Sequence, residues 1–136
     1  WFNTQFNHPR EITPEAARAC EMLLEAGVPV SNQSVLLRGV NDSYETMRDL
    51  LYGLQRISVR PYYLFQCDPV KGTDHFRVDL HSGMKIMGEI LKNISGLCVP
   101  RYVIDLPDGK REIPLQPFPL PSESISISKT SGSVST

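Results

Sequence analysis

Four short stretches of the chain are rich in apolar, aromatic and β-branched residues, and polar or helix-like segments separate them. They cover residues 1–6, 28–37, 60–65 and 99–105. The third stretch, from Arg60 to Phe65, is nearly continuous in apolar and aromatic side chains, which is typical of a buried parallel strand. We therefore predict four β-strands.

The segments between these strands carry apolar residues at helical spacing. The first begins at Thr13-Pro14-Glu15, which supplies a hydroxyl N-cap, proline at the first helical position and an early acid, and it stops at Gly27. Asp42 or Ser43 caps the second helix, and the third runs roughly from Leu80 to Ile94. The residues expected to face inward are Ala17, Cys20, Leu23 and Leu24; Met47, Leu50, Leu51 and Leu54; and Met84, Met87, Ile90 and Leu91.

Alternation of strands and helices implies parallel strands joined by right-handed crossovers. An open sheet of four strands would have two edges that need cover. The chain also starts at Trp1, without an initiator methionine and already within a predicted strand. We therefore expect a piece of a longer protein: an α/β fold forming the C-terminal half of a partial (β/α) barrel, with four parallel strands and three crossover helices. It covers residues 1–116, and the Ser-rich residues 117–136 are predicted to be disordered.

Composition limits the classes of partner. The formal net charge is −1, from 14 basic and 15 acidic side chains, so no footprint for nucleic acid or a membrane surface is present. No apolar run approaches the roughly 20 residues of a membrane span, and no signal peptide is visible. Three scattered cysteines argue against a disulfide framework, so we expect a cytoplasmic protein. Exposed sheet edges also make a homo-oligomer possible.

Two aspartates follow strands at the C-terminal ends, where α/β folds gather binding groups. Asp68 comes just after the third strand, and Asp105 ends the fourth. Two carboxylates on neighbouring strand ends form a site for a cation, such as an ammonium group. Alternatively each acid caps a turn, because Asp-Pro and Asp-Leu-Pro are ordinary turn openings. Spacing alone leaves both interpretations open.

Four other residues have a chemical interpretation and a structural one. Gln33, in an otherwise apolar strand, either contacts a ligand inside the barrel or is a hydrogen-bonded core amide. Lys110 either forms an imine with a carbonyl cofactor or is simply solvated between two acids. His75 is better interpreted as a surface histidine than as an acid–base group, and Cys67 as a buried thiol rather than a nucleophile.

Motifs along about residues 1–120 match one enzyme family. The longest is the run from Asn32 to Asp42, Asn-Gln-Ser-Val-Leu-Leu-Arg-Gly-Val-Asn-Asp. The others are Phe6-Asn7-His8-Pro9 with Glu11-Ile12-Thr13, Gly27-Val28-Pro29, Arg60-Pro61-Tyr62-Tyr63, Gln66-Cys67-Asp68, Gly72, His75-Phe76-Arg77, and Ser95-Gly96 with Val99-Pro100. Together they resemble the radical S-adenosylmethionine (radical SAM) aminomutases, specifically lysine 2,3-aminomutase.

The resemblance implies a substrate and three cofactors. Family enzymes use a 4Fe–4S cluster to cleave S-adenosylmethionine, and the radical acts on lysine held by pyridoxal phosphate, interconverting L-α-lysine and L-β-lysine. Asp68 and Asp105 match the two aspartates that grip the lysine ammonium, a pair that would repel a glutamate side chain. Gln33 matches a residue at the S-adenosylmethionine site, and Gln5 stands where the family has a histidine near that cofactor.

The chain also departs from the family pattern. The cluster motif CxxxCxxC belongs to the N-terminal half and is absent from this sequence, and Ser43 replaces a zinc-binding cysteine. Counting without gaps from Asp105 puts Glu112 at the position of the cofactor lysine, and Lys110 falls two residues short. Two hypotheses remain: part of a radical enzyme whose missing N-terminal half carries the cluster, or a degenerate non-catalytic remnant that binds lysine or another cation.

Overall fold

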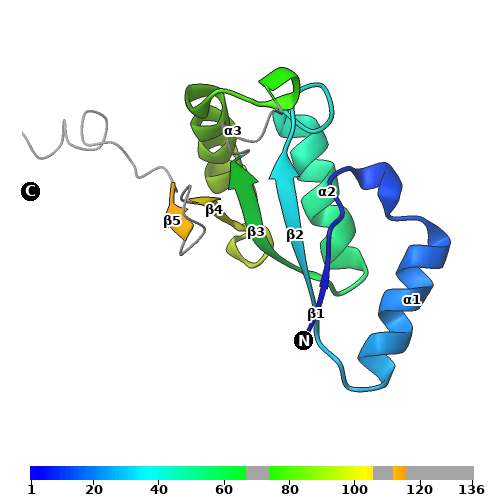
Figure 1. Cartoon of the computed structure of the whole chain (residues 1–136). Coiled ribbons are helices and arrows are strands. Elements are labelled where there is room, and N and C mark those ends of the chain that lie inside the picture. Colours follow the sequence, from blue (N-terminus) through cyan, green and yellow to red (C-terminus); the bar gives the residue numbers. More distant parts are fainter. Residues whose placement is uncertain (67–73, 106–111, 116–136) are drawn as a thin grey trace, which may run out of the picture.

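The computed structural model describes residues 1–66, 74–105 and 112–115, which form one five-stranded sheet with three α-helices (Figure 1). The strands are β1 (Phe2–Thr4), β2 (Val30–Leu36), β3 (Arg60–Gln66), β4 (Arg101–Asp105) and β5 (Glu112–Pro114). The helices are α1 (Pro14–Glu25), α2 (Tyr44–Arg56) and α3 (Leu80–Asn93), with short 3-10 turns η1 (Pro9–Glu11), η2 (Asp74–Phe76) and η3 (Gly96–Cys98). The predicted tail, residues 117–136, lies outside the described part.

The first four strands are parallel and lie side by side in chain order. One helix connects each to the next, so the prediction of four parallel strands with three crossover helices is confirmed. The fifth strand was not predicted. β5 pairs antiparallel with β4, and the Leu115 N–H extends the pairing by donating to the carbonyl of Tyr102 at 2.6 Å. A strand of three residues ending in a proline is too short to show an alternating pattern.

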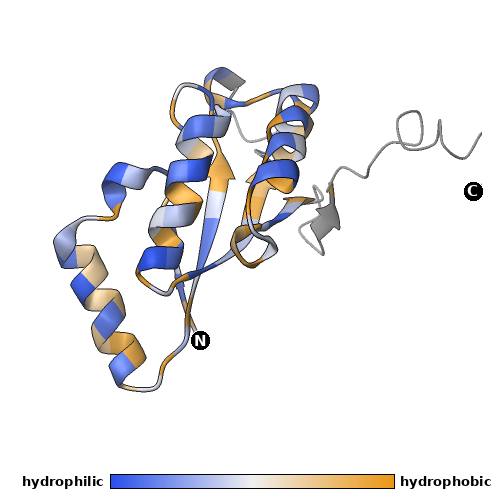
Figure 2. Ribbon diagram, turned by 180° about the vertical axis from the view of Figure 1, so that it is seen from behind, coloured by the Kyte–Doolittle hydropathy of each residue, from blue (hydrophilic) through white to orange (hydrophobic). Residues whose placement is uncertain are grey.

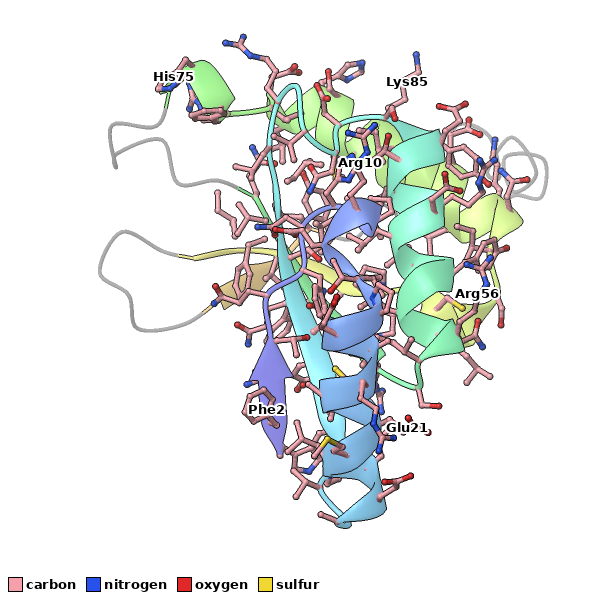
Figure 3. All side chains as sticks on the ribbon, turned by 90° about the vertical axis from the view of Figure 1, so that its right-hand side faces the viewer. Phe2, Arg10, Glu21, Arg56, His75 and Lys85 are labelled. Carbon is pink, nitrogen blue, oxygen red and sulfur yellow. The ribbon has the colours of Figure 1, made fainter. Side chains whose placement is uncertain are left out.

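The helices lie on one side of the sheet, as the edge-on view shows (Figure 3). Hydrophilic residues lie along the outward faces of α2 and α3 (Figure 2). The buried core under them combines apolar residues of the helices with alternate residues of the strands. Its fully buried members include Met47, Leu50 and Leu54 of α2, Met87 and Ile90 of α3, and Leu36, Leu64 and Tyr102 of the strands. The inward face predicted for α2 is therefore confirmed.

Side-chain caps start the first two helices where the sequence predicts them. Thr13 caps α1, and the helix ends before Gly27, whose φ of +83° lies in the left-handed region that glycine tolerates best. Ser43, rather than Asp42, caps α2 by accepting the Thr46 N–H at 3.2 Å. Asp42 instead accepts the N–H of Gly39 at 3.0 Å. Ser43 therefore has a structural role at the position where the family resemblance implies a zinc-binding cysteine.

The predicted inward stripe of α3 is wrong at one residue. Leu91 is 42% exposed, whereas Gly83, Ile86, Met87 and Ile90 are buried. The helix turns this stripe toward the sheet because Gly83 lies directly against the ring of Tyr102. Leu91, one position past Ile90, is rotated by about 100° from that residue around the helix axis and is largely exposed. In α1, Cys20 is buried and Leu23 and Leu24 are half-buried against the core.

The contact between α3 and β4 gives a testable prediction. A Cβ at Gly83 would lie 2.0 Å from Oη of Tyr102, so Gly83→Ala should lower the free energy of unfolding by about 1–3 kcal/mol in a urea titration. Adding Tyr102→Phe removes the clashing oxygen and should recover part of the loss. Gly88→Ala in the same helix is the matched control, since nothing lies within 4 Å of its added Cβ. Equal effects of Gly83→Ala and Gly88→Ala would contradict this packing.

Candidate functional site

The carboxyl ends of β3 and β4 meet at one edge of the sheet. Gln66, the last residue of β3, pairs with Ile104, and Asp105 is the next residue and the end of β4. Asp68 follows Gln66 by two positions and lies outside the described residues, as does Lys110. The backbone of Asp105 is described, whereas its side chain is not. The relative placement of the two carboxylates therefore stays a prediction.

The face of the sheet away from the helices carries Gln33. Its Cα partner is Tyr63 of β3, which in turn pairs with Arg101 of β4. These positions alternate with the helix-facing residues of each strand, so their side chains belong to the opposite face. Gln33 is half-buried there, on the face that forms the interior of a barrel. This placement is compatible with the ligand interpretation of Gln33.

Aromatic rings lie next to Gln33 on β3. The register between β2 and β3 shifts here: Gln33 pairs with Tyr63, and Tyr62 is skipped. The rings of Tyr62 and Tyr63 have centroids 4.3 Å apart, and those of Tyr63 and Phe65 are 5.3 Å apart. Bulges of this kind redirect side chains beside binding sites, and a row of rings offers a flat apolar surface.

Buried asparagines fix the loops at this end of the sheet. Asn41 is fully buried, and its Oδ1 accepts the Leu37 N–H at 2.8 Å. Its Nδ2 donates to the carbonyls of Asn7 and Val35 at 2.8 and 2.9 Å. These three hydrogen bonds to backbone groups thus hold the loop after β2 against the loop after β1. The motif asparagine at 41 has a structural role.

Asn32, within β2, also holds the loop that follows β1. Its Oδ1 accepts the N–H of Phe6 at 2.7 Å, and its Nδ2 donates to the Phe6 carbonyl at 3.1 Å. Gln5, the residue before this anchor, is exposed and lies between β1 and η1. Glu11 then closes the turn by accepting the N–H groups of Asn7 and His8 at 2.5 and 3.0 Å. These hydrogen bonds therefore hold residues 6–11 in place directly after Gln5.

A second buried network lies under the ends of β3 and β4. The hydroxyl of Tyr102 donates to Oε1 of Gln66 at 2.6 Å, and Nε2 of Gln66 donates to the carbonyl of Val78 at 2.6 Å. Burial, with a smaller contribution from the charge of Asp79, raises the pKa of Tyr102 to about 12. The phenol is therefore a neutral donor throughout the physiological range. Neither Gln66 nor Tyr102 was identified from the sequence as a site residue.

The loop after β2 also pairs with the segment that precedes α3. The Arg38 guanidinium donates two hydrogen bonds, of 3.1 and 2.7 Å, to the carbonyl of His75. The backbone N–H of Arg38 donates to the carbonyl of Phe76 at 2.7 Å. Leu37 forms an isolated antiparallel bridge with Arg77. The His75 side chain is exposed, as expected of a surface histidine.

Within residues 1–66, 74–105 and 112–115, no group of three His, Cys, Asp or Glu side chains could hold a metal ion. The described residues therefore do not fit a 4Fe–4S cluster. In the same part of the chain, no helix has both the length and the apolar character needed to cross a membrane.

The sequence relatives found by comparison with known proteins include two aminomutases with different named substrates. The L-lysine 2,3-aminomutase of Clostridium subterminale is 50% identical over 117 residues, which cover 86% of this chain and 28% of that enzyme. The glutamate 2,3-aminomutase of Clostridioides difficile is 46% identical, again over 117 residues, 86% of this chain and 28% of the relative. The chain thus spans less than a third of the length of these enzymes. No family model matches it.

Among solved structures, a radical SAM methyltransferase from Sphaerobacter thermophilus aligns with a TM-score of 0.50. The alignment covers 74% of this chain and 33% of the methyltransferase, with 20% sequence identity. At this identity the likeness concerns the fold alone. It agrees with an α/β sheet that is part of a radical SAM type of barrel.

The buried amide of Asn41 gives a direct test of the loop framework. In Asn41→Asp a carboxylate oxygen takes the place of Nδ2, which in the wild-type protein donates to the carbonyls of Asn7 and Val35. That oxygen then faces two other oxygens and has no hydrogen to donate to them. We expect the free energy of unfolding at neutral pH to fall by about 3 kcal/mol, because a charged group is buried with only the Leu37 N–H as donor and with two carbonyl oxygens against its second oxygen. Asn93→Asp, at the exposed end of α3, is the matched control and should cost less than about 1 kcal/mol. Equal losses in the two urea titrations would refute the role given to Asn41.

Proposed function

We propose that this chain is a homologue of the C-terminal part of the lysine 2,3-aminomutases and that it supplies their substrate-binding strand ends. In this proposal the complete protein is a cytoplasmic radical enzyme that interconverts L-α-lysine and L-β-lysine. Asp68 and Asp105 bind the side-chain ammonium of the substrate. A missing N-terminal part carries the cluster.

The register of β3 and β4 is the observation that supports the assignment of the two aspartates to the substrate ammonium. Gln66 and Ile104 are direct partners, so the chain leaves both strands at the same height, two residues before Asp68 and one before Asp105. A pair of carboxylates at that edge attracts an ammonium group and repels a second carboxylate. This preference is needed to choose between lysine and glutamate, because the relatives include aminomutases named for each.

The open face of the sheet supports the cofactor assignments. Gln33 lies on that face and Gln5 lies in the loop after β1, and in this proposal S-adenosylmethionine binds beside them. The β1 strand is short and lies at the sheet edge, with Phe2 48% exposed, so a preceding strand of the N-terminal part can pair there (Figure 3). In this proposal that part brings the cluster ligands.

Pyridoxal phosphate is the least supported cofactor. Glu112, at the position counted for the family lysine, is the Cα partner of Asp105 on β5. A glutamate cannot form an imine with the cofactor aldehyde, so the task would pass to Lys110, two residues earlier. This substitution favours the alternative function, a non-catalytic protein that keeps the two aspartates and binds lysine or a similar cation.

The proposal is tested by the affinity of the chain for L-lysine, followed by NMR chemical-shift titration. Asp68→Asn and Asp105→Asn should each weaken L-lysine binding about tenfold, because each removes one charged hydrogen bond to the ammonium. The side chain of L-norleucine has the same four carbons as that of L-lysine but ends in a methyl group without the ammonium. It should therefore bind weakly and equally to all variants.

Asp49→Asn on α2 is the matched control, since its exposed carboxylate pairs with Arg48 far along the chain from the strand ends. It should leave L-lysine affinity unchanged. An unaltered affinity in both strand-end variants would overturn the substrate assignment.

A further inference from the structure

Asn32 lies at the centre of a buried hydrogen-bond network between β2 and the end of β1. Its side chain is 1% exposed. Its Oδ1 accepts the Thr4 hydroxyl at 2.8 Å and the Phe6 N–H at 2.7 Å. Its Nδ2 donates to the Phe6 carbonyl at 3.1 Å and to the Ser34 hydroxyl at 2.8 Å. Ser34 in turn donates to the Phe6 carbonyl at 2.7 Å, so two side chains of β2 hold the backbone of Phe6.

The residues of this Asn32 network are the sequence neighbours of two glutamines. The neighbours are Thr4 and Phe6 of Gln5, and Asn32 and Ser34 of Gln33. Thr4 and Asn32 are direct Cα partners, so Gln5 and Gln33 come next on neighbouring chains. Each glutamine is therefore enclosed in the sequence by anchored residues, and the anchors of one are bonded to the anchors of the other.

The two glutamine side chains leave the sheet on the face away from the helices. Phe6 packs against the hydrophobic core and the Thr4 hydroxyl bonds to Asn32, so the residue between them points the other way. Gln33 belongs to the same face, as its pairing with β3 shows. Gln5 is exposed and Gln33 is half-buried, so a ligand on this face can reach both carboxamides.

The Asn32 network takes the place of strand pairing where β1 has ended. Phe6 lies two residues beyond Thr4, the last paired residue of β1, and the Asn32 amide binds both its N–H and its carbonyl. Apolar side chains at positions 32 and 34 would cost less to bury but would leave these backbone groups unpaired. A satisfied hydrogen-bond network also has one geometry, whereas hydrophobic contact is non-directional. The network therefore fixes the chain that carries Gln5.

We propose that Asn32 and Ser34 are positioning residues that hold Gln5 beside Gln33, so that the two carboxamides bind the same molecule of S-adenosylmethionine. This inference rests on the cofactor assignment in the proposed function. Neither Asn32 nor Ser34 touches the ligand, because both side chains are buried on the helix side of the sheet. Carboxamides donate and accept hydrogen bonds, which suits the hydroxyl and amino groups of an adenosyl compound.

The test measures the affinity of the whole chain for S-adenosylmethionine by NMR titration. In the wild-type background, Gln5→Ala and Gln33→Ala should each weaken binding about fivefold, because each removes a neutral hydrogen bond to the ligand. Asn32→Ser should weaken binding by a similar factor. In the Asn32→Ser background Gln5→Ala should have no further effect, since Gln5 is no longer held in place. Gln33→Ala should still cost about fivefold there, because the β2 ladder continues to hold it.

Ser31→Ala is the matched control. Ser31 is a buried serine of the same strand, and its hydroxyl donates to the side chain of Asn3. Gln5→Ala should keep its full fivefold cost in this background. A general loss of folded protein lowers the affinity of every variant in a background by the same factor, so the cost of Gln5→Ala reports positioning alone.

Ser34→Ala removes one hydrogen bond to the Phe6 carbonyl and carries the test if Asn32→Ser does not fold. A full cost of Gln5→Ala in the folded Asn32→Ser or Ser34→Ala background overturns the inference and leaves the proposed function standing. So does a wild-type chain in which Gln33→Ala weakens binding and Gln5→Ala does not. A wild-type chain that does not bind S-adenosylmethionine, or binds it equally after both substitutions, overturns the cofactor assignment and this inference with it.

Discussion

The parallel hydrogen-bonded register of β2, β3 and β4 is the constraint on which the rest of the structure depends. It aligns the strands so that all three end at one edge of the sheet, with Leu36, Gln66 and Ile104 in a row of direct partners. The crossover helices then have to cover one face, and the other face remains open with Gln33 and its aromatic neighbours. A binding site at the strand ends is a consequence of this geometry.

Buried polar side chains convert that register into a defined edge. Asn32 attaches the loop after β1 to β2, and Asn41 attaches the same loop to the one after β2. Gln66 with Tyr102 attaches β3 to β4 and to the segment before α3. Among the described residues, no buried side-chain nitrogen or oxygen lacks a hydrogen-bond partner. Such networks contribute modestly to net stability but strongly to a single geometry, which is what a site built from several loops requires.

The sequence predicts local features well and distant contacts poorly. The Thr13 cap and the inward face of α2 follow from short-range patterns, and both are present. The orientation of α3 depends on the contact of Gly83 with Tyr102, which no helical periodicity contains, so Leu91 was wrongly expected to be buried. The bond between Tyr102 and Gln66 joins residues 36 positions apart, for the same reason beyond a pattern-based prediction. The two aspartates were predicted from strand ends and family resemblance, and their side chains lie outside the described residues.

The central claim is that an amino acid with a side-chain ammonium binds where β3 and β4 end. It is tested most directly by mapping the amide resonances of the wild-type chain that shift on addition of L-lysine. We expect the largest shifts to cluster at Gln66 and Asp105 and in the loops that follow them, and to be absent with L-norleucine. Shifts confined to the outward faces of α1 and α2, or identical with both ligands, would contradict it.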